Sequence, residues 1–338
     1  MLTQDILDDY RPYCDSEVPA AIQRIAQDAF FPQIADFVFP EKELNGFLDE
    51  FKQIKTVDEF QAKIMYKAIS KVVEQTISTL THSGLEHLDK DKSYMFIANH
   101  RDIVLDSAVL QVVLYANQFK TSEITFGSNL MKPQLVVDIG KLNKMFKIIR
   151  GGSLREVFTN SLNVSKYMRY AITEKNESTW IAQRNGRTKD GNDKTEIAVL
   201  KMFAMSSKKP FVENLGELNI TPISVSYEYE PCDFLKTREI YISRRQTYVK
   251  ESGEDLNSIL QGIRQFKGNT HYTICPTITS DELKACSKQT SSERFKYLAD
   301  IIDQRIYSGY RLWKTNYIAH DILHDKAQFV DFYSNEDK

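Results

Sequence analysis

The stretch Tyr94-Met95-Phe96-Ile97-Ala98, followed at once by Asn99-His100-Arg101-Asp102, decides the fold of this 338-residue chain. A short uncharged apolar run bounded by a polar cluster is typical of a buried strand that ends in a loop. The pattern returns at Ile124–Phe126 and at Thr179–Ala182, with helical spacing between the runs. This alternation predicts an α/β fold with a mixed, largely parallel sheet flanked by helices. In such sheets, sites form where loops leave the carboxyl ends of strands.

The alternation of apolar runs and helical segments continues toward the C-terminus, whereas the spacing of apolar residues before residue 90 is mostly helical. We therefore predict an N-terminal helical region over residues 1–80, followed by an α/β domain over residues 81–338 that ends in a C-terminal helical extension. The additional expected strands are Ile220–Tyr227, Glu239–Ser243 and Tyr272–Cys275, and the expected helices are 107–115, 153–172, 194–205 and 255–266.

Two aromatic segments interrupt the helical pattern of the N-terminal region. They are Ala29-Phe30-Phe31-Pro32 and Phe37-Val38-Phe39-Pro40. Such side chains can rest on a membrane surface, but they more often pack a helical cap onto the core, and we favour packing.

Composition and charge argue against several classes of protein. The chain has 42% hydrophobic and 27% charged residues, and its net charge of −2 argues against a dedicated nucleic-acid binder. Residues 1–60 hold 5 Lys or Arg against 13 Asp or Glu, whereas residues 151–210 hold 11 against 6. This asymmetry suggests that one surface meets an anion, although ordinary surface variation explains it equally well. The four cysteines show no spacing typical of a metal site or a disulfide framework.

His100 is the first candidate for chemistry, because it follows the first predicted strand directly. Asp102 and Asp106 lie two and six residues further on. A carboxylate beside an imidazole fixes its tautomer and stabilises the imidazolium, so the group can act as a general base. For an isolated His-Asp pair, a solvated polar loop is the commoner explanation.

A second cluster follows the third predicted strand, at Gln183–Gly191. Arg184, Arg187 and Lys189 supply cations, and Gly186 allows a close approach of the backbone, so this loop could neutralise a phosphate. A solvated turn accounts equally well for this loop taken alone. Two further polar clusters lie between the two described, at Gly127-Ser128-Asn129 and at Phe146–Gly152.

Taken in order, these clusters resemble the sequence blocks of the glycerol-phosphate acyltransferase superfamily, most closely its glycerol-3-phosphate 1-acyltransferase branch. Asn99-His100-Arg101 with a following aspartate resembles the His-x-x-x-x-Asp block. The second block is matched by Gly127–Leu130 with Phe146–Arg150, the third by Asn185–Lys189, and the fourth by Ile220–Val225. Any one block is weak, but four in this order, across residues 80–280, make the resemblance specific.

The resemblance implies transfer of an acyl group from a thioester, either acyl-CoA or acyl carrier protein, to a hydroxyl of glycerol-3-phosphate. His100 would be the general base, with Asp106 as its partner and Asp102 as the alternative. No metal and no cofactor beyond the thioester co-substrate is implied. The residues implied in acceptor binding are Arg150, Arg187, Lys189, Ser128, Asn129, Gly186 and Arg184.

Two features depart from the family's pattern. Its aspartate would fall on Leu105, and its glutamate in the third block would fall on Arg184 or Gln183. The second departure bears on the acceptor, so a lysophosphatidate or an acylated amino-acid lipid remains an alternative. The altered His-Asp spacing leaves a third possibility, a catalytically silent lipid-binding protein.

Location is inferred from what the sequence lacks together with the long-chain product that the resemblance implies, and the partners are those that the resemblance implies. No apolar run reaches the roughly 18 residues that span a bilayer, and the N-terminus lacks the pattern of a signal peptide. We expect a cytoplasmic protein that binds peripherally to the inner face of the membrane and takes an acyl thioester and a phosphate-bearing acceptor. Its membrane contacts are expected among the aromatics of 30–39 or the basic strip Lys141, Lys144, Lys147 and Arg150. Nucleic acid is not expected as a partner, because the basic segment 151–210 lacks interleaved aromatics.

Overall fold

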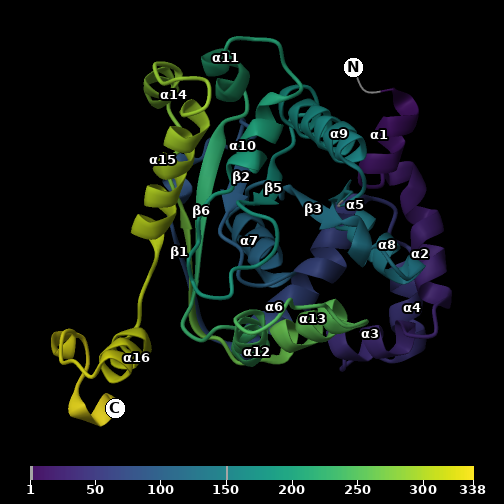
Figure 1. Cartoon of the computed structure of the whole chain (residues 1–338). Helices are drawn as coiled ribbons and strands as arrows, with labels where there is room; N and C mark the ends of the chain where they lie inside the picture. Colours follow the sequence, from purple (N-terminus) through teal and green to yellow (C-terminus); the bar gives the residue numbers. More distant parts are fainter. Residues whose placement is uncertain (1–2, 150) are drawn as a thin grey trace.

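The computed structural model describes residues 3–149 and 151–338. Within them, seven strands form one sheet in the order β1-β7-β6-β2-β5-β3-β4 (Figure 1). Neighbouring strands are parallel except β6 and β7, which pair antiparallel, so the expected fold class is confirmed. The strands are β1 Ile77–Ser83, β2 Met95–Ala98, β3 Glu123–Gly127, β4 Met145–Ile148, β5 Thr179–Ala182, β6 Ile220–Tyr227 and β7 Gly268–Ile274.

Three elements differ from the expectation. The strand expected at Glu239–Ser243 is wrong, because this stretch is the C-terminal part of helix α12 (Asp233–Ser243). Five residues are too few to separate a period of two from a period of 3.6. Strand β1 follows helix α6 (Tyr66–Thr76) without a break, so the helical region expected to reach residue 80 ends at Thr76. Strand β4 is only four residues long and was not expected as a strand.

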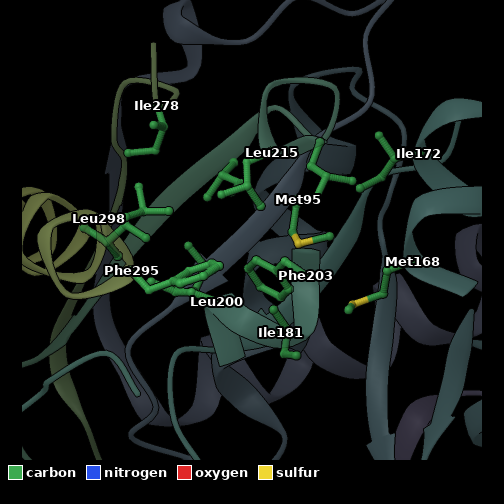
Figure 2. Close-up of a cluster of buried hydrophobic side chains, with 14 of the residues drawn as sticks. Met95, Met168, Ile172, Ile181, Leu200, Phe203, Leu215, Ile278, Phe295 and Leu298 are labelled. Carbon is green, nitrogen blue, oxygen red and sulfur yellow. The ribbon is translucent and has the colours of Figure 1, made fainter. Parts of the chain in front are cut away.

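Helices cover both faces of the sheet, and strand β2 shows how. Met95 and Ile97 belong to the core under α9 and α10, whereas Phe96 and Ala98 belong to the core under α6 and α7. All four are buried, which is why this strand reads as a continuous apolar run. Figure 2 shows part of the first core, a cluster that includes Met95 and side chains of α9, α10 and α15. The helices around the sheet are α7 Leu105–Ala116, α8 Gln134–Leu142, α9 Leu154–Thr173, α10 Ile197–Ala204, α11 Phe211–Gly216, α13 Glu254–Arg264, α14 Ser280–Ser287 and α15 Arg294–Gly309.

The N-terminal helices have an aromatic core of their own. The Phe31 ring lies 5.6 Å from that of Phe47 and 5.1 Å from that of Phe51. Phe31 and Phe39 are buried, as the packing interpretation expects, while Phe30 and Phe37 remain exposed. This core also includes Leu142 of α8, so it continues onto the α/β part. The helices are α1 Gln4–Tyr10, α2 Val18–Gln27, α3 Phe31–Val38, α4 Leu44–Lys52 and α5 Val57–Phe60, with a π-helical turn at Gln61–Met65 before α6.

Most of the predicted basic strip is covered by the N-terminal helical region. Lys147 pairs with Asp9, and Lys144 lies 3.5 Å from a carboxylate oxygen of Asp58. Lys141 lies over the ring of Tyr13. Arg150, the last member of the strip, lies outside the described residues. The acidic charge of residues 1–60 is thus partly matched by cations of the α/β part of the chain.

The C-terminal extension projects from the body of the molecule (Figure 1). Helix α15 packs along β6, and the chain then leaves it to form α16 (Lys314–His324). Asp321 of α16 accepts hydrogen bonds from Tyr333 and from the backbone N–H of Phe329, so this extension is folded on itself. Among the helices described, none combines the length and apolar character needed to cross a bilayer.

Candidate functional site

The parallel strands β6, β2, β5, β3 and β4 all end at one edge of the sheet, so the loops that follow them meet there. Helices α12 and α13 lie across the same edge. Between loops and helices is a cavity of about 150 Å³, with apolar walls that include Trp180 and Ile124. Five of the sequence-predicted site residues line it, namely His100, Asn129, Gly186, Arg187 and Lys189.

His100 has a buried carboxylate partner. Its Nδ1 lies 2.9 Å from Oδ2 of Asp106, and the Asp106 side chain is fully buried. Because this carboxylate oxygen also receives two backbone N–H groups, it can only accept, and Nδ1 must carry the proton. The other imidazole nitrogen, Nε2, is therefore the one available to accept a proton in the cavity.

The carboxylate of Asp106 is held by the loop and by β6. Its Oδ2 accepts the backbone N–H groups of Arg101, at 2.6 Å, and of Asp102, at 2.9 Å. Its Oδ1 accepts the hydroxyl of Tyr227, at 3.1 Å. Burial raises the pKa of Tyr227 well above its ordinary value, so the phenol stays protonated and remains a donor. Hydrogen bonds from Arg101, Asp102 and Tyr227 thus fix the orientation of the Asp106 carboxylate beside His100.

Asp102 has a different place. Its Oδ1 accepts the backbone N–H groups of Val104 and Leu105, at 2.9 and 2.8 Å, where α7 begins. Burial, followed by the nearby charge of Asp106, raises the pKa of Asp102. Its Oδ2 has no hydrogen-bond partner among the described residues and lies against Gly262 of α13, where an added Cβ would be only 1.9 Å away. Of the two candidate partners for His100, the structure places Asp106 against the imidazole and gives Asp102 a role in holding the loop.

The loop after β5 brings cations to the cavity. Its position is tied to the first loop, because the backbone N–H of Thr188 donates to the carbonyl of His100 at 3.0 Å. Arg187 and Lys189 line the cavity, and Nη1 of Arg187 is buried with no hydrogen-bond partner in the described chain. Gly186 has a φ of 78°, a conformation that glycine adopts without strain. Arg184 is not part of the lining; its guanidinium lies 3.4 Å from the carbonyl of Asn192.

The remaining predicted residues divide between the cavity and its surroundings. Asn129 lines the cavity and its Nδ2 lies 3.4 Å from Oδ2 of Asp255 on α13. Ser128, its neighbour, is not among the described lining residues. Arg150 lies outside the described residues, so its predicted role in binding a phosphate stays a prediction.

Sequence reasoning missed the acidic side of the cavity. Glu239 on α12 lies 3.0 Å from Nζ of Lys189, and Asp255 on α13 pairs with Lys250. All four side chains line the cavity. Glu239 was hidden because its segment was expected as a strand, and no local pattern links α12 or α13 to the loop after β5.

A partly buried ionic network next to His100 in the chain was also missed. Arg101 lies 2.9 Å from Asp193, and Lys236, which is 3% exposed, donates to the carbonyl of Arg101 at 2.8 Å and to Glu230 at 2.6 Å. Tyr310 donates to Asp193 from the far end of α15. Removing one member of such a network would leave another charge unpaired, so the network holds the His100 loop firmly.

Comparisons with known proteins give likenesses of structure and none of sequence. No protein-family model and no curated protein matches the chain. Among solved structures, the chain is similar to the crystal structure of the 1-acyl-sn-glycerophosphate (LPA) acyltransferase PlsC from Thermotoga maritima. The sequence identity is 12% and the TM-score 0.41, over 87% of this chain and 96% of that chain. A likeness this distant carries no argument about the chemistry of the present site.

Proposed function

We propose that the protein is an acyltransferase that moves an acyl group from a thioester to a hydroxyl of glycerol-3-phosphate or a related phosphate-bearing lipid precursor. The observation that carries the proposal is the buried His100–Asp106 pair at 2.9 Å, lining one cavity together with Arg187 and Lys189. The ordered sequence blocks point to the same chemistry independently of this geometry. A general base and a set of cations in one cavity suit a hydroxyl nucleophile that carries a phosphate.

In the proposed reaction, Nε2 of His100 takes the proton of the acceptor hydroxyl as its oxygen attacks the thioester carbonyl. The new C–O bond forms while the carbonyl electrons move to oxygen, and Asp106 stabilises the imidazolium that results. When the intermediate collapses, the C–S bond breaks and the imidazolium returns its proton to the leaving sulfur. The products are an ester and a free thiol, with no net change in the protein.

No protein nucleophile is needed, because a thioester is already activated. Burial raises the pKa of Cys232, and it raises that of Cys275 to about 11. Both thiols are therefore protonated at neutral pH and poor nucleophiles. This agrees with a direct transfer in which His100 acts on the acceptor hydroxyl.

Binding of the acceptor phosphate is proposed for Arg187 and Lys189, with Arg150 as a further candidate from the sequence. Arg187 lines the cavity, and a guanidinium is the group that binds phosphate through paired N–H donors. Lys189 already faces Glu239, so a phosphate must compete with that carboxylate. The pairing of cations with carboxylates leaves the identity of the acceptor open between glycerol-3-phosphate, a lysophosphatidate and an acylated amino-acid lipid.

The test is release of free thiol by the purified full chain, measured with palmitoyl-CoA and palmitoyl acyl carrier protein against each acceptor in turn. We expect release that depends on an acceptor and is lost in His100→Ala. Release with a different acceptor would retain the mechanism and change the substrate. Folded protein that releases no thiol with any pair would contradict the proposal and favour a silent lipid-binding protein.

The proposed location follows from the proposed substrates. Long-chain products partition into membranes, so we propose a peripheral position on the inner face of the cell membrane.

A further inference from the structure

Helix α12 carries an exposed stripe in which aromatic and arginine residues alternate. Phe234, Arg238, Tyr241 and Arg245 follow one another at intervals of four, three and four residues, which places them on one helical face. Phe234 is 72% exposed and Tyr241 is 59% exposed. The guanidinium of Arg245, just beyond the end of the helix, lies 3.7 Å from the centre of the Tyr241 ring. These four residues are called the aromatic–arginine stripe below.

The segment around the stripe is basic, and three of its five cations are paired: Lys236 with Glu230, Arg238 with Glu251 and Lys250 with Asp255. Residues 236–250 contain five Lys or Arg and a single acidic residue, Glu239. Within the described chain, Arg244 and Arg245 take part in no ion pair, whereas the lysines of the strip at 141–147 are covered by the N-terminal helices. Val249, in the loop between α12 and α13, is 77% exposed and follows Arg245 by four residues in the sequence.

The other side of this two-helix segment belongs to the cavity. Glu239, Lys250, Asp255 and Ile259 line it. A surface in contact with the stripe would therefore lie about one helix diameter, roughly 10 Å, from the cavity.

We propose that α12 and the loop to α13 bind the surface of an anionic phospholipid bilayer through the aromatic–arginine stripe, Arg244 and Val249. Cationic side chains pair with lipid phosphates, while aromatic and apolar side chains enter the region of the headgroups. An acidic protein would match the arginines but would leave Phe234 and Val249 without a reason to be exposed. Binding of the protein to vesicles does not depend on the proposed acyl transfer. Only the further step, in which a lipid passes between the bilayer and the cavity, rests on the proposed function.

The test is sedimentation of the full chain with vesicles of phosphatidylcholine alone, and with vesicles of phosphatidylcholine and phosphatidylglycerol in a two-to-one ratio. We expect binding to the mixed vesicles that weakens as salt is added. Arg244→Gln with Arg245→Gln should reduce the affinity about 30-fold, since each cation near an anionic surface contributes roughly fivefold. Phe234→Ser with Tyr241→Ser should reduce it at least about tenfold through lost apolar burial.

The matched control is Leu154→Ser with Phe158→Ser on α9, which lies away from α12 (Figure 1). These residues are 91% and 61% exposed, so the control removes a comparable apolar surface and should leave vesicle binding unchanged. Equal losses in the control and the stripe variants, or wild-type protein that binds neither kind of vesicle, would overturn the proposal. So would binding to an acidic acyl carrier protein, but not to vesicles, that depends on Arg244 and Arg245.

Activity provides a separate readout. The stripe residues line no part of the cavity, so their variants should keep wild-type activity with water-soluble, short-chain substrates. Wild-type protein that binds vesicles but transfers no acyl group would count against the proposed function alone.

Discussion

Asp106→Asn removes one negative charge beside His100 while it keeps the size of the side chain. The asparagine oxygen can still accept the backbone N–H groups of Arg101 and Asp102 and the Nδ1–H of His100, which now come to Asp106 Oδ2. Its amide group then faces the hydroxyl oxygen of Tyr227, which is able to accept. The variant should therefore fold normally, and what it loses is the stabilisation of the imidazolium.

The size of that loss follows from the geometry. The Nδ1–Oδ2 distance of 2.9 Å places the centres of the two charges about 4 Å apart. At an effective dielectric constant of about 20, the interaction is about 4 kcal/mol, which corresponds to about a thousandfold in rate. We expect this fall in kcat/KM for thiol release, with an unchanged circular dichroism spectrum and thermal midpoint.

Asp102→Asn is the matched control, because the sequence offered both aspartates as the partner of His100. Its oxygen can still accept the N–H groups at the start of α7, and no atom of Asp102 is bonded to the imidazole. We expect kcat/KM to change by less than about threefold. A loss in Asp102→Asn as large as that in Asp106→Asn, or less than about a tenfold loss in Asp106→Asn, would refute the reasoning.

Three further predictions use other parts of the structure. Gly262→Ala would place a methyl carbon 1.9 Å from Oδ2 of Asp102, so it should destabilise the protein by about 1–3 kcal/mol in urea unfolding. Its control is Gly46→Ala on α4, where an added Cβ meets no atom within 4 Å and should stabilise the protein by up to about 1 kcal/mol. Equal effects of the two glycine variants would contradict the close contact. Burial lowers the pKa of Lys267 to about 8 in the folded protein, against about 10.4 in the unfolded chain. Between these two pH values the unfolded chain holds the proton and the folded protein does not, so the free energy of unfolding rises with pH. Lys267→Met should flatten that part of the profile of unfolding free energy against pH, and an unchanged slope would rule out the shift. Glu239→Gln frees the lysine that it faces, so KM for a phosphate-bearing acceptor should fall severalfold with little change in kcat; a rise in KM would instead mean that this carboxylate binds the acceptor.

Local pattern was sufficient for most of the fold. Four of the predicted runs form strands, because each holds enough apolar residues for the strand to be buried on one or both faces of the sheet. They are the runs at 94–98, 124–126, 179–182 and 220–227. Strand β1 was missed because its residues, ISTLTHS, follow a helix directly and are exposed at many positions. Such a strand is defined by its pairing with β7, more than 180 residues away in sequence, and not by its own composition.

Part of the candidate site was accessible in the same way. His100, Asn129, Gly186, Arg187 and Lys189 were identified from residue type and position after a strand, and all of them line the cavity. The sequence did not reveal that Arg184 lies outside the cavity while Arg187 and Lys189 line it, because the direction of each side chain depends on the folded conformation of the loop.

The sequence by itself determined the class of fold, the strand ends at which polar groups collect, and the presence of a histidine with aspartates nearby. Only the tertiary structure decided that Asp106, and not Asp102, meets the imidazole, because the start of α7 turns one carboxylate toward His100 and the other toward Val104 and Leu105. It also decided that Lys144 and Lys147 face carboxylates from distant helices. Hydrogen-bond direction and charge pairing depend on groups far apart in sequence, whereas burial of an apolar run depends mainly on the run itself.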